Sequence, residues 1–304
     1  MRFALTAEQR QFAASLHDAL ARPPGWHELA ELGVTALAVP DDRGGLGAAP
    51  VDLVVAFEEL GHHAVPGPLV ESLAAVPTLL ARLDDRKWLP AMASGDLVAT
   101  MTCPPHVPYA VDADTADLVL AVAPDSVRLA EPTGPALSSV DPNRRLFAVV
   151  PATELASDTG AAIEWAFDAG VLACAAQLLG AGRAMLDLSV SYVKQRTQFG
   201  RPIGQFQAVK HHLADVHVGL ELARPVVFGA AVTMTRRDVS AAKIAAGRAA
   251  YRAARAALQV HGAIGYTMEY DLSRWLTMVR ALVSAWGSDA VHRARVLADL
   301  RSGP

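Results

Sequence analysis

The sequence predicts a mainly α-helical protein with a small β region in its middle, so that the order along the chain is helix, small sheet, helix. Apolar residues recur at steps of three and four before residue 95 and again after residue 161, which is the spacing of one helix face. Between residues 96 and 158, short apolar runs are separated by Pro, Asp and Gly, as is typical of strands. A chain of 304 residues with 52% hydrophobic composition has enough apolar material for a large core.

Residues 1–95 are predicted to form an N-terminal helical domain. "TAEQ" places Thr6 three residues before Gln9, the capping-box pattern that begins a helix. Apolar residues recur at helical spacing in "VDLVVAFEELGHH" and in "PLVESLAAVPTLLARL". The preceding "DDRGGLGAAP" is rich in glycine and is predicted to be a loop.

Residues 96–158 are predicted to form a small β domain. Strands are expected in four short apolar runs, "LVATMTC", "ADLVLAVA", "SVRLAE" and "RRLFAVVP". Each run is bounded by residues that favour turns, so the strands are expected to be short.

Residues 159–304 are predicted to form a C-terminal helical bundle. Three apolar stripes step by three and four: Leu178, Ala181, Met185, Leu188 and Tyr192; Phe206, Val209, Leu213, Val216 and Leu220; Ile244, Gly247, Tyr251, Ala254 and Leu258. The segments "DLSRWLTMVRALV" and "SDAVHRARVLADL" are predicted to add helices to this bundle.

Composition and charge exclude several classes of partner. The net charge is −4 with a pI near 6.2, and there is no block of Lys and Arg that could neutralise nucleic-acid phosphates. Apolar runs such as "VLACAAQLLGAG" fall short of the ~20 residues that span a bilayer, so no membrane association is expected. The first residues lack the apolar segment of a signal peptide. Cys103 and Cys174 provide neither a disulfide framework nor zinc spacing, so we expect a cytoplasmic protein, and the excess of arginine over lysine suggests a bacterial one.

Several common motifs are absent or have a simpler explanation. "GAGRAM" at Gly180 lies within a helical stripe and lacks the third glycine of a dinucleotide-binding turn, so close helix packing explains it better. There is no Walker phosphate loop and no G-x-S-x-G.

Clusters of charged residues and histidines also favour ordinary explanations. The histidines near Asp215 have no ligand-spaced partner, so no metal is expected there and exposed polar residues are predicted instead; they are His211, His212 and His217. A solvated helix end is predicted for the four residues Glu58, Glu59, His62 and His63. One helix face, facing solvent or another subunit, is predicted for Arg248, Arg252 and Arg255.

The stretch "RTQFGRPIGQFQAVKHHLADV" at residues 196–216 is the first candidate binding segment. It places Arg196, Gln198 and Gln207 around a break rich in Gly and Pro. A guanidinium can form paired hydrogen bonds to a phosphate, and two amides can read the edge of a base, so an anionic ligand that carries adenine would explain all three. A network of Arg and Gln that caps the helix ends would explain them equally well.

The stretch "QVHGAIGYTMEYDLSRWL" at residues 259–276 is the second candidate. Gln259 ends a helix, and a turn with Gly262 and Gly265 follows. Such a turn can bring backbone N–H groups close to an anion. The alternative is a plain helix C-cap.

In this order and spacing, the two stretches resemble the acyl-CoA dehydrogenase flavoprotein family. "GLGAAPVDLVVAFEELG" and "WLPAMASGDLVAT" are also similar to that family, so the resemblance covers nearly the whole chain and is strongest over residues 180–274. It implies an N-terminal helical domain, a β middle domain that is truncated here, a C-terminal four-helix bundle, and dimers or tetramers. It further implies that FAD is held across a subunit interface by Arg196, Gln198, Phe199, Gln207, Gln259, Gly262 and Gly265.

The resemblance also implies α,β-dehydrogenation of an acyl-CoA thioester, in which a carboxylate removes the α-proton and the β-hydrogen leaves as hydride to the flavin. Here the sequence departs from the family. Trp286 stands where the family has its base, and the alternative base position falls at about Gly170. Asp168 and Glu164 lie on other helical faces, so the catalytic residue stays unassigned. The family's Thr-Glu-Pro becomes Thr-Cys-Pro at Thr102, and the strand that carries a flavin-contacting tryptophan is missing.

Three functions are compatible with these residues. The first is an FAD-binding subunit of a heteromeric acyl-CoA dehydrogenase, in which a longer homologous partner supplies the base and an electron-transfer acceptor reoxidises the flavin. Bacterial family members of this short type include some that act on CoA thioesters of steroid side chains. The second is a self-sufficient homodimer or homotetramer with an unrecognised carboxylate, and the third is a non-catalytic scaffold. The bulk of Trp286 predicts that the space beside it is closed or too narrow for an acyl chain.

Overall fold

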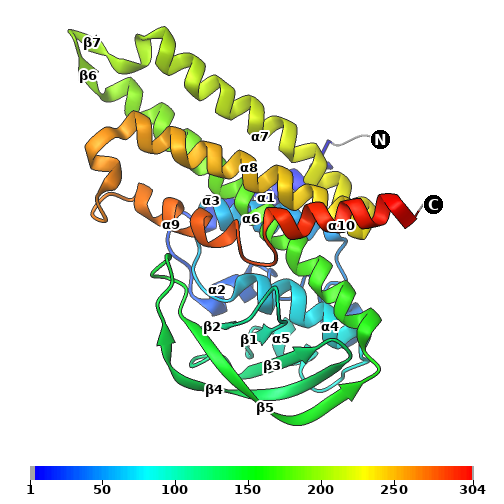
Figure 1. The fold of residues 1–304 in the computed structure, drawn as a ribbon. Helices are drawn as coiled ribbons and strands as arrows, with labels where there is room; N and C mark the ends of the chain where they lie inside the picture. The colour runs from blue at the N-terminus through cyan, green and yellow to red at the C-terminus, as the bar shows by residue number, and fades with distance from the viewer. Residues whose placement is uncertain (1–3, 303–304) are drawn as a thin grey trace.

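The computed structural model describes residues 4–302 and brings the helices from both ends of the chain together, with a twisted sheet at one side of them (Figure 1). The mainly α-helical fold class is confirmed. The elements follow the predicted order: helices up to Ala93, strands between Ala99 and Ser157, and helices again from Gly160. The division into three domains at residues 95 and 158 stays a prediction.

The N-terminal part consists of short helices, several of which pack on one long C-terminal helix. The capping box at its start is formed, because the Gln9 amide donates to Thr6 Oγ1 and the Thr6 amide donates to Gln9 Oε1, both at 3.1 Å. The elements are α1 (Ala7–Ala19), α2 (Trp26–Glu31), η1 (Asp41–Arg43), α3 (Pro50–His62), η2 (Glu71–Ala75), α4 (Val76–Arg82) and α5 (Leu89–Ala93).

The middle part is one five-stranded sheet in the order β1-β3-β4-β5-β2, in which only β1 and β3 are parallel. Its strands are β1 (Ala99–Thr102), β2 (Ala110–Val111), β3 (Leu118–Ala123), β4 (Ser126–Leu137) and β5 (Leu146–Ser157). The expectation of short strands is wrong for β4 and β5, which have 12 residues each. Prolines in β4 broke the sequence pattern, but the strand continues through them: Pro132 pairs with Val149, and a register shift between Thr133 and Leu137 spans Pro135. The sequence did not indicate β2, which has 2 residues.

The C-terminal part is built on α6, a helix of 36 residues. The elements are α6 (Gly160–Gln195), β6 (Thr197–Gln198), β7 (Arg201–Pro202), η3 (Ile203–Gln205), α7 (Gln207–Thr233), α8 (Arg236–His261), η4 (Gly262–Tyr266), α9 (Leu272–Leu282) and α10 (Asp289–Ser302). The packing interpretation of "GAGRAM" is confirmed, because a Cβ on Gly180 would lie 1.8 Å from the Glu58 carbonyl oxygen of α3. Glycine therefore lets α3 and α6 touch through their backbones.

Two helices, α6 and α7, are long and apolar enough to cross a bilayer by length and composition alone. The short apolar runs of the sequence did not indicate this. In α6 the most apolar window is 89% buried within the fold, as expected for a core helix. The corresponding window of α7 is 39% buried, because one side of this helix packs on α6 and α8 and the other faces outward (Figure 1).

Candidate functional site

The stretch that begins at Arg196 forms a small hairpin that projects from one end of the helical part (Figure 1). Its two strands, β6 and β7, pair Gln198 with Arg201. Phe199 and Gly200 at the tip have φ angles of 53° and 77°, the left-handed region that few side chains adopt readily. The Phe199 side chain is 91% exposed. A strained and exposed aromatic residue at a hairpin tip indicates a contact beyond this chain.

The polar residues of the two candidate segments have no partners of their own. Within residues 4–302, the side chains of Arg196, Gln198, Gln207 and Gln259 are exposed and form no hydrogen bond or ion pair. The alternative of a network of Arg and Gln that caps the helix ends is therefore wrong. The helix end agrees with this, since Phe206, the N-cap residue of α7, forms no side-chain cap. Free donors of this kind suit an anionic ligand.

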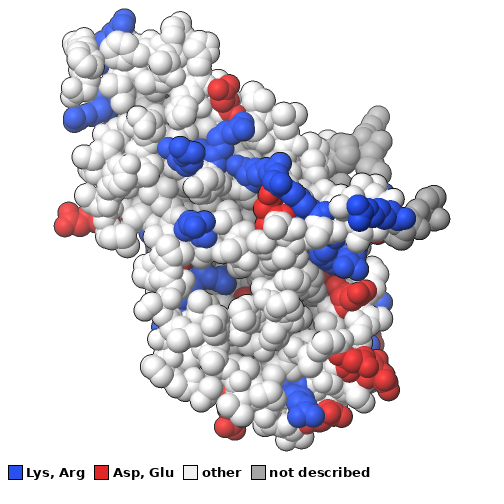
Figure 2. Space-filling view, in the orientation of Figure 1, with Lys and Arg blue, Asp and Glu red and all other residues white. Residues whose placement is uncertain are grey.

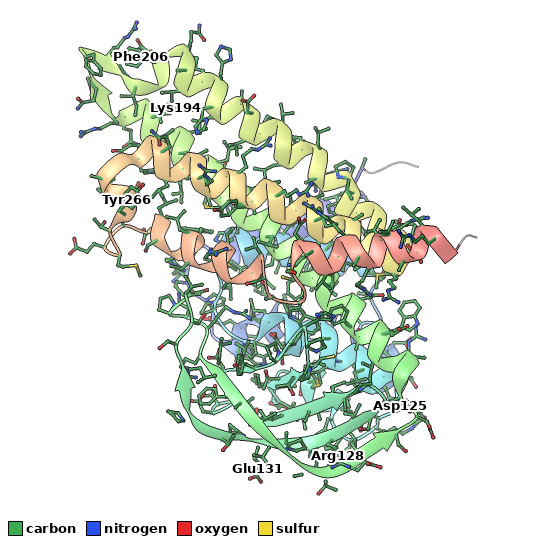
Figure 3. All side chains as sticks on the ribbon, viewed as in Figure 1. Asp125, Arg128, Glu131, Lys194, Phe206 and Tyr266 are labelled. Carbon is green, nitrogen blue, oxygen red and sulfur yellow. The ribbon has the colours of Figure 1, made fainter. Side chains whose placement is uncertain are left out.

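The glycine turn lies at the same end of the bundle as the hairpin, as the positions of Tyr266, Lys194 and Phe206 show (Figure 3). The Tyr192 ring near the end of α6 stacks on the His261 ring at the end of α8, with ring centroids 4.3 Å apart. Gly262 is the C-cap of α8 with φ of 63°, so the predicted C-cap is formed. The structure thus brings both candidate segments to one end of the molecule.

A groove of about 570 Å³ separates α7 from α8 beside Gln259. Its walls carry three guanidinium groups and one carboxylate, those of Arg248, Arg252, Arg255 and Asp215. Figure 2 shows the row of Lys and Arg side chains that runs over α8 and α10. The face formed by these arginines is exposed, as predicted, and its positive charge continues the unpartnered polar surface at the end of the bundle.

At the opposite side of the helical part, Trp286 and Gly170 are in direct contact. Trp286 is 1% exposed, and a Cβ on Gly170 would lie 2.3 Å from the Trp286 ring. These are the two positions at which the resemblance places a catalytic base. Neither Trp286 nor Gly170 offers a group that can accept a proton. The Trp286 indole also fills the space that an acidic side chain at position 170 would need.

Buried polar groups hold the turn that carries Trp286. The Lys243 ammonium donates to the Leu282 carbonyl at 2.9 Å and to the Gly287 carbonyl at 3.4 Å. His292 Nε2 lies 2.9 Å from the Trp286 carbonyl oxygen, so this nitrogen carries the proton. Burial lowers the pKa of His292 to about 4, with Lys243 adding to the shift. The ring is therefore neutral at pH 7 and acts as a fixed hydrogen-bond donor.

The carboxylates near Trp286 in sequence are already engaged. Asp168 pairs with Arg295 in a buried ion pair, and burial raises the pKa of Asp168 while Arg295 opposes the shift. Glu164 is exposed on the other side of α6. Asp289 pairs with Arg248 and Arg293. None of the three presents a free carboxylate to the space beside Trp286.

Glu71 is a carboxylate that the sequence analysis missed. It lies in η2, a turn of π-helix, and is 0% exposed. Trp286 Nε1 donates to Glu71 Oε1 at 3.2 Å, whereas Oε2 has no hydrogen-bond partner in the described part of the chain. Burial raises the pKa of Glu71, and Arg144 opposes the shift. The signal was present in the sequence, because a single acid stands inside the apolar run "PLVESLAAV".

A hollow of about 310 Å³ lies between the Trp286 turn and the loops of the sheet. Glu71, His106, Arg144 and Trp286 are among its walls. Its volume is at the lower end of the range of small-molecule sites, about 300–1,000 Å³. The first alternative, that this space is closed, is therefore wrong, because the Trp286 ring turns toward Gly170 and a hollow remains beside it. The second alternative, that the space is too narrow for an acyl chain, stays a prediction.

Two further predictions have definite outcomes. The solvated helix end is wrong for the two acids, because α6 and α7 cover them: Glu58 is 3% exposed and Glu59 is 5% exposed. Arg224 donates to both carboxylate oxygens of Glu58, at 3.2 and 3.3 Å. The histidines of α7 near Asp215 are exposed, as predicted.

Comparisons with known proteins match both ends of the chain. The model of the acyl-CoA dehydrogenase N-terminal domain matches residues 4–96, and that of the acyl-CoA dehydrogenase C-terminal domain matches residues 159–300. The chain is 36% identical over 252 residues to acyl-CoA dehydrogenase IpdE2 of Mycobacterium tuberculosis, covering 81% of this chain and 77% of that protein. It is 32% identical over 292 residues to acyl-CoA dehydrogenase IpdE2 of Mycolicibacterium smegmatis, covering 94% and 91%.

Solved structures agree on the fold. Glutaryl-coenzyme A dehydrogenase in complex with glutaryl-CoA aligns with a TM-score of 0.89 at 20% identity, over 100% of this chain and 98% of that one. A chain of the ChsE4–ChsE5 complex from Mycobacterium tuberculosis aligns with a TM-score of 0.86 at 21% identity, over 100% of this chain and 100% of that one. The resemblance seen in the sequence is thereby confirmed. The chain belongs to the acyl-CoA dehydrogenase family of FAD-dependent oxidoreductases.

Proposed function

We propose that this chain is the FAD-binding, base-lacking subunit of a heteromeric acyl-CoA dehydrogenase. The observation that carries the proposal is the contact between Trp286 and Gly170, because it fills both positions of the family's base with groups that cannot take a proton. In this proposal, a carboxylate on another chain removes the α-proton of the substrate. A longer family member that retains this carboxylate is the partner that fits.

The residues at the end of the bundle fit the adenine and pyrophosphate half of FAD. Arg196 offers a charge-assisted contact to a phosphate, and Gln198, Gln207 and Gln259 offer amides to a base or ribose, all without partners in the described chain. The turn from Gly262 to Gly265 brings backbone amides to the same place, and Phe199 would pack against the ligand or the partner subunit. When bound, FAD supplies the acceptor for the hydride that leaves the β-carbon.

A structural relative supports a heteromeric assembly. The ChsE4–ChsE5 structure is a complex of two named proteins, and this chain aligns with a full chain of it. The substrate class that follows is an acyl-CoA of lipid or steroid degradation, and electrons would pass to an electron-transfer protein. The exposed Phe199 and the arginine row on α8 give the partner a surface to recognise.

The experiment compares the purified chain alone with the chain co-expressed with a longer family member from the same genome. Acyl-CoA-dependent dye reduction and bound flavin per chain are measured in both preparations. We expect turnover in the complex only, and its loss when the partner's carboxylate is changed to the amide. Turnover by the homogeneous chain without a partner would refute the proposal.

A second function rests on Glu71. This acid is fully buried, has a raised pKa, and lines the hollow beside Trp286, which are the properties of a general base kept out of water. It would make the chain a self-sufficient homo-oligomeric dehydrogenase. The test is Glu71→Gln, because it should abolish turnover of the isolated chain if Glu71 is the base. In the heteromer, Glu71→Gln should leave turnover in place, because the partner's carboxylate removes the α-proton there.

A further inference from the structure

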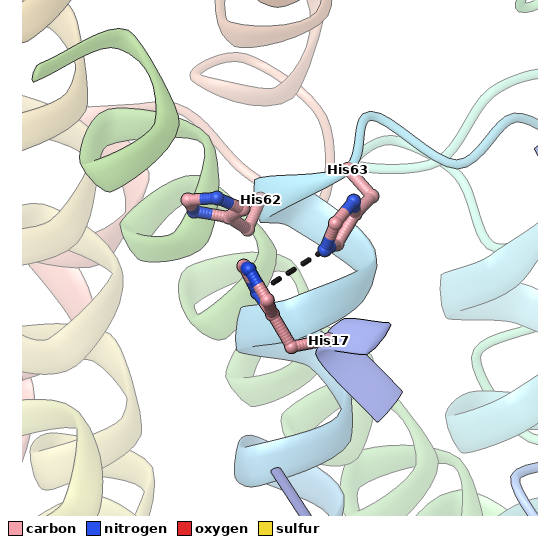
Figure 4. A group of neighbouring side chains, drawn as sticks. All are labelled: His17, His62 and His63. Carbon is pink, nitrogen blue, oxygen red and sulfur yellow. Dashed lines mark hydrogen bonds between the residues drawn. The ribbon is translucent and has the colours of Figure 1, made fainter. Parts of the chain in front are cut away.

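Three histidines that are far apart in sequence meet at the corner between α1 and α3. His17 lies on α1, His62 is the last residue of α3, and His63 follows it. Figure 4 shows the three rings facing a common space. Ring centroids are 4.7–5.1 Å apart, and the three ligand-capable atoms all lie within 4.8 Å of one another. In the part of the chain that the structure describes, this is the one group of at least three His, Cys or acidic residues with such spacing.

The hydrogen bonds in this cluster leave lone pairs in excess. His17 Nδ1 lies 2.9 Å from Glu59 Oε2 and 3.2 Å from His63 Nε2. A carboxylate can only accept, so without a metal His17 Nδ1 carries a proton that it donates to Glu59, and a metal ion bound at this nitrogen would take the place of that proton. His63 Nε2 can also direct a lone pair toward the space between the three rings. His62 Nδ1 is buried and has no hydrogen-bond partner among the described residues.

We propose that His17, His62 and His63 form a binding site for a divalent transition-metal ion of the zinc class. Two nitrogens bound to one tetrahedral Zn²⁺ at the usual 2.0–2.1 Å lie about 3.3 Å apart. His17 Nδ1 and His63 Nε2 already stand 3.2 Å apart. The His62 nitrogen must approach by a ring rotation, and the fourth ligand is Glu59 Oε2 or a water. Neutral imidazoles are preferred ligands of this ion.

The surrounding fold fixes two of the three ligands. The His62 carbonyl accepts from Trp275 Nε1 at 2.9 Å, and the His63 carbonyl accepts from Arg274 at 3.4 Å. Both histidines are thereby held against α9, whereas His17 is the only ligand on α1. A bound ion would therefore fasten α1 to the corner of α3 and α9.

The charges around the cluster are nearly balanced, which suits a site made of neutral ligands. Glu58 and Glu59 are offset by Arg224 and Arg183, the latter 3.6 Å from Glu59 Oε1. The affinity of the site for a metal would therefore come from the positions and the lone pairs of the imidazoles, and not from an excess of negative charge around them. It is independent of the proposed acyl-CoA function, because the cluster is separate from the hollow beside Trp286 and from the hairpin of Arg196.

The test measures Zn²⁺ binding to the full-length chain after removal of any affinity tag, by calorimetry and by competition with a coloured chelator. We expect one Zn²⁺ per chain. His17→Gln and His63→Gln should each weaken binding by on the order of tenfold or more. His27→Gln is the matched control, because His27 is an exposed histidine of α2 whose ion-pair partner is Glu31. His27→Gln should bind Zn²⁺ with the same affinity as the unchanged protein.

Two further readouts separate a built site from scattered surface binding. Zn²⁺ should raise the melting temperature of the unchanged chain and of His27→Gln, and should do so less in the two site variants. Co²⁺ in place of Zn²⁺ should give the visible absorption of a tetrahedral site. The proposal is overturned if the unchanged chain binds no Zn²⁺, or if His27→Gln weakens binding as much as the variants of His17 and His63, provided that circular dichroism shows all variants folded.

Discussion

At the scale of single residues, the contact between Trp286 and Gly170 determines what occupies the two positions at which the resemblance places a catalytic base. The indole occupies the volume that a side chain at position 170 would need, and its N–H is satisfied by Glu71. His292 and Lys243 hold the carbonyl groups of the same turn. The position at which the resemblance places the base is thus part of the core, and its environment can be tested by stability measurements.

Gly170→Ala should destabilise the chain. A new Cβ would lie 2.3 Å from the Trp286 ring, so the ring or α6 must move, at a cost of about 1–3 kcal/mol. Gly247→Ala is the matched control in a helix, because its Cβ would meet nothing within 4 Å and should add roughly 0.5–1 kcal/mol of stability. Urea unfolding of the three proteins checks both signs. Equal stabilisation by the two changes would show that Trp286 is not packed on Gly170.

The stability of the fold should fall between pH 6.5 and about 4 because of His292. Burial lowers the pKa of this histidine from 6.5 to about 4, so in that window the unfolded chain binds a proton that the folded chain does not. The free energy of unfolding falls by roughly 1.4 kcal/mol per pH unit as the pH is lowered through this window. The decrease due to His292 ends below its folded pKa. His292→Gln keeps a donor for the Trp286 carbonyl and should flatten the curve. A difference between the two proteins that stays constant from pH 7 to about pH 4 would contradict the assignment.

At the scale of elements, the sequence determined the type of most helices and strands but not the extent of every one. Helical spacing predicted the buried face of α6, and the capping box predicted the start of α1. The lengths of β4 and β5 were missed because their pairing with each other outweighs the prolines that interrupt the local pattern. The sequence could not show which residues of different elements meet, so the contact of Glu71 with Trp286 and the cluster around His17 appeared only in three dimensions.

The β6–β7 hairpin is the element on which cofactor binding should depend. Arg196→Ala should weaken FAD binding to the assembled enzyme by on the order of 1.5–3 kcal/mol, about tenfold or more, because it removes a charge-assisted contact to a phosphate. Arg128→Ala on β4 is the control, since this half-exposed arginine pairs with Glu154 on the sheet (Figure 3). Flavin fluorescence titration measures both. Unchanged affinity in Arg196→Ala would remove the hairpin from the FAD site.

At the scale of the whole molecule, the candidate surfaces are divided between two ends of the helical part. The unpartnered polar residues and the arginine groove lie at the hairpin end, and the hollow beside Trp286 lies toward the sheet. Under the proposed function, the surface at the hairpin end is the adenine half of a cofactor site, and the hollow is an acyl site without the family's base. An assembly of unlike subunits would use the first and leave the second without turnover.

The assembled enzyme should contain one functional FAD for each pair of unlike subunits. The reason is that, under the proposed function, this chain contributes the Arg196 end to its partner's flavin, whereas Trp286 and Gly170 leave its own hollow without the family's base. Subunit masses from native mass spectrometry, together with flavin absorbance after denaturation, give the ratio. Two equally reactive flavins per pair, each bleached by acyl-CoA, would contradict this division of labour.

The contact between Trp286 and Gly170 also limits how such a chain could change its role over generations. Replacing Trp286 by an acid alone would leave a void against Gly170 and an unpaired carboxyl in the core. An acid introduced at Gly170 alone would collide with the indole. Under the proposed function, both routes to a self-contained catalyst pass through an unstable single mutant. Dependence on a partner, once acquired, would then be maintained by the packing of two residues even without selection for the partnership itself.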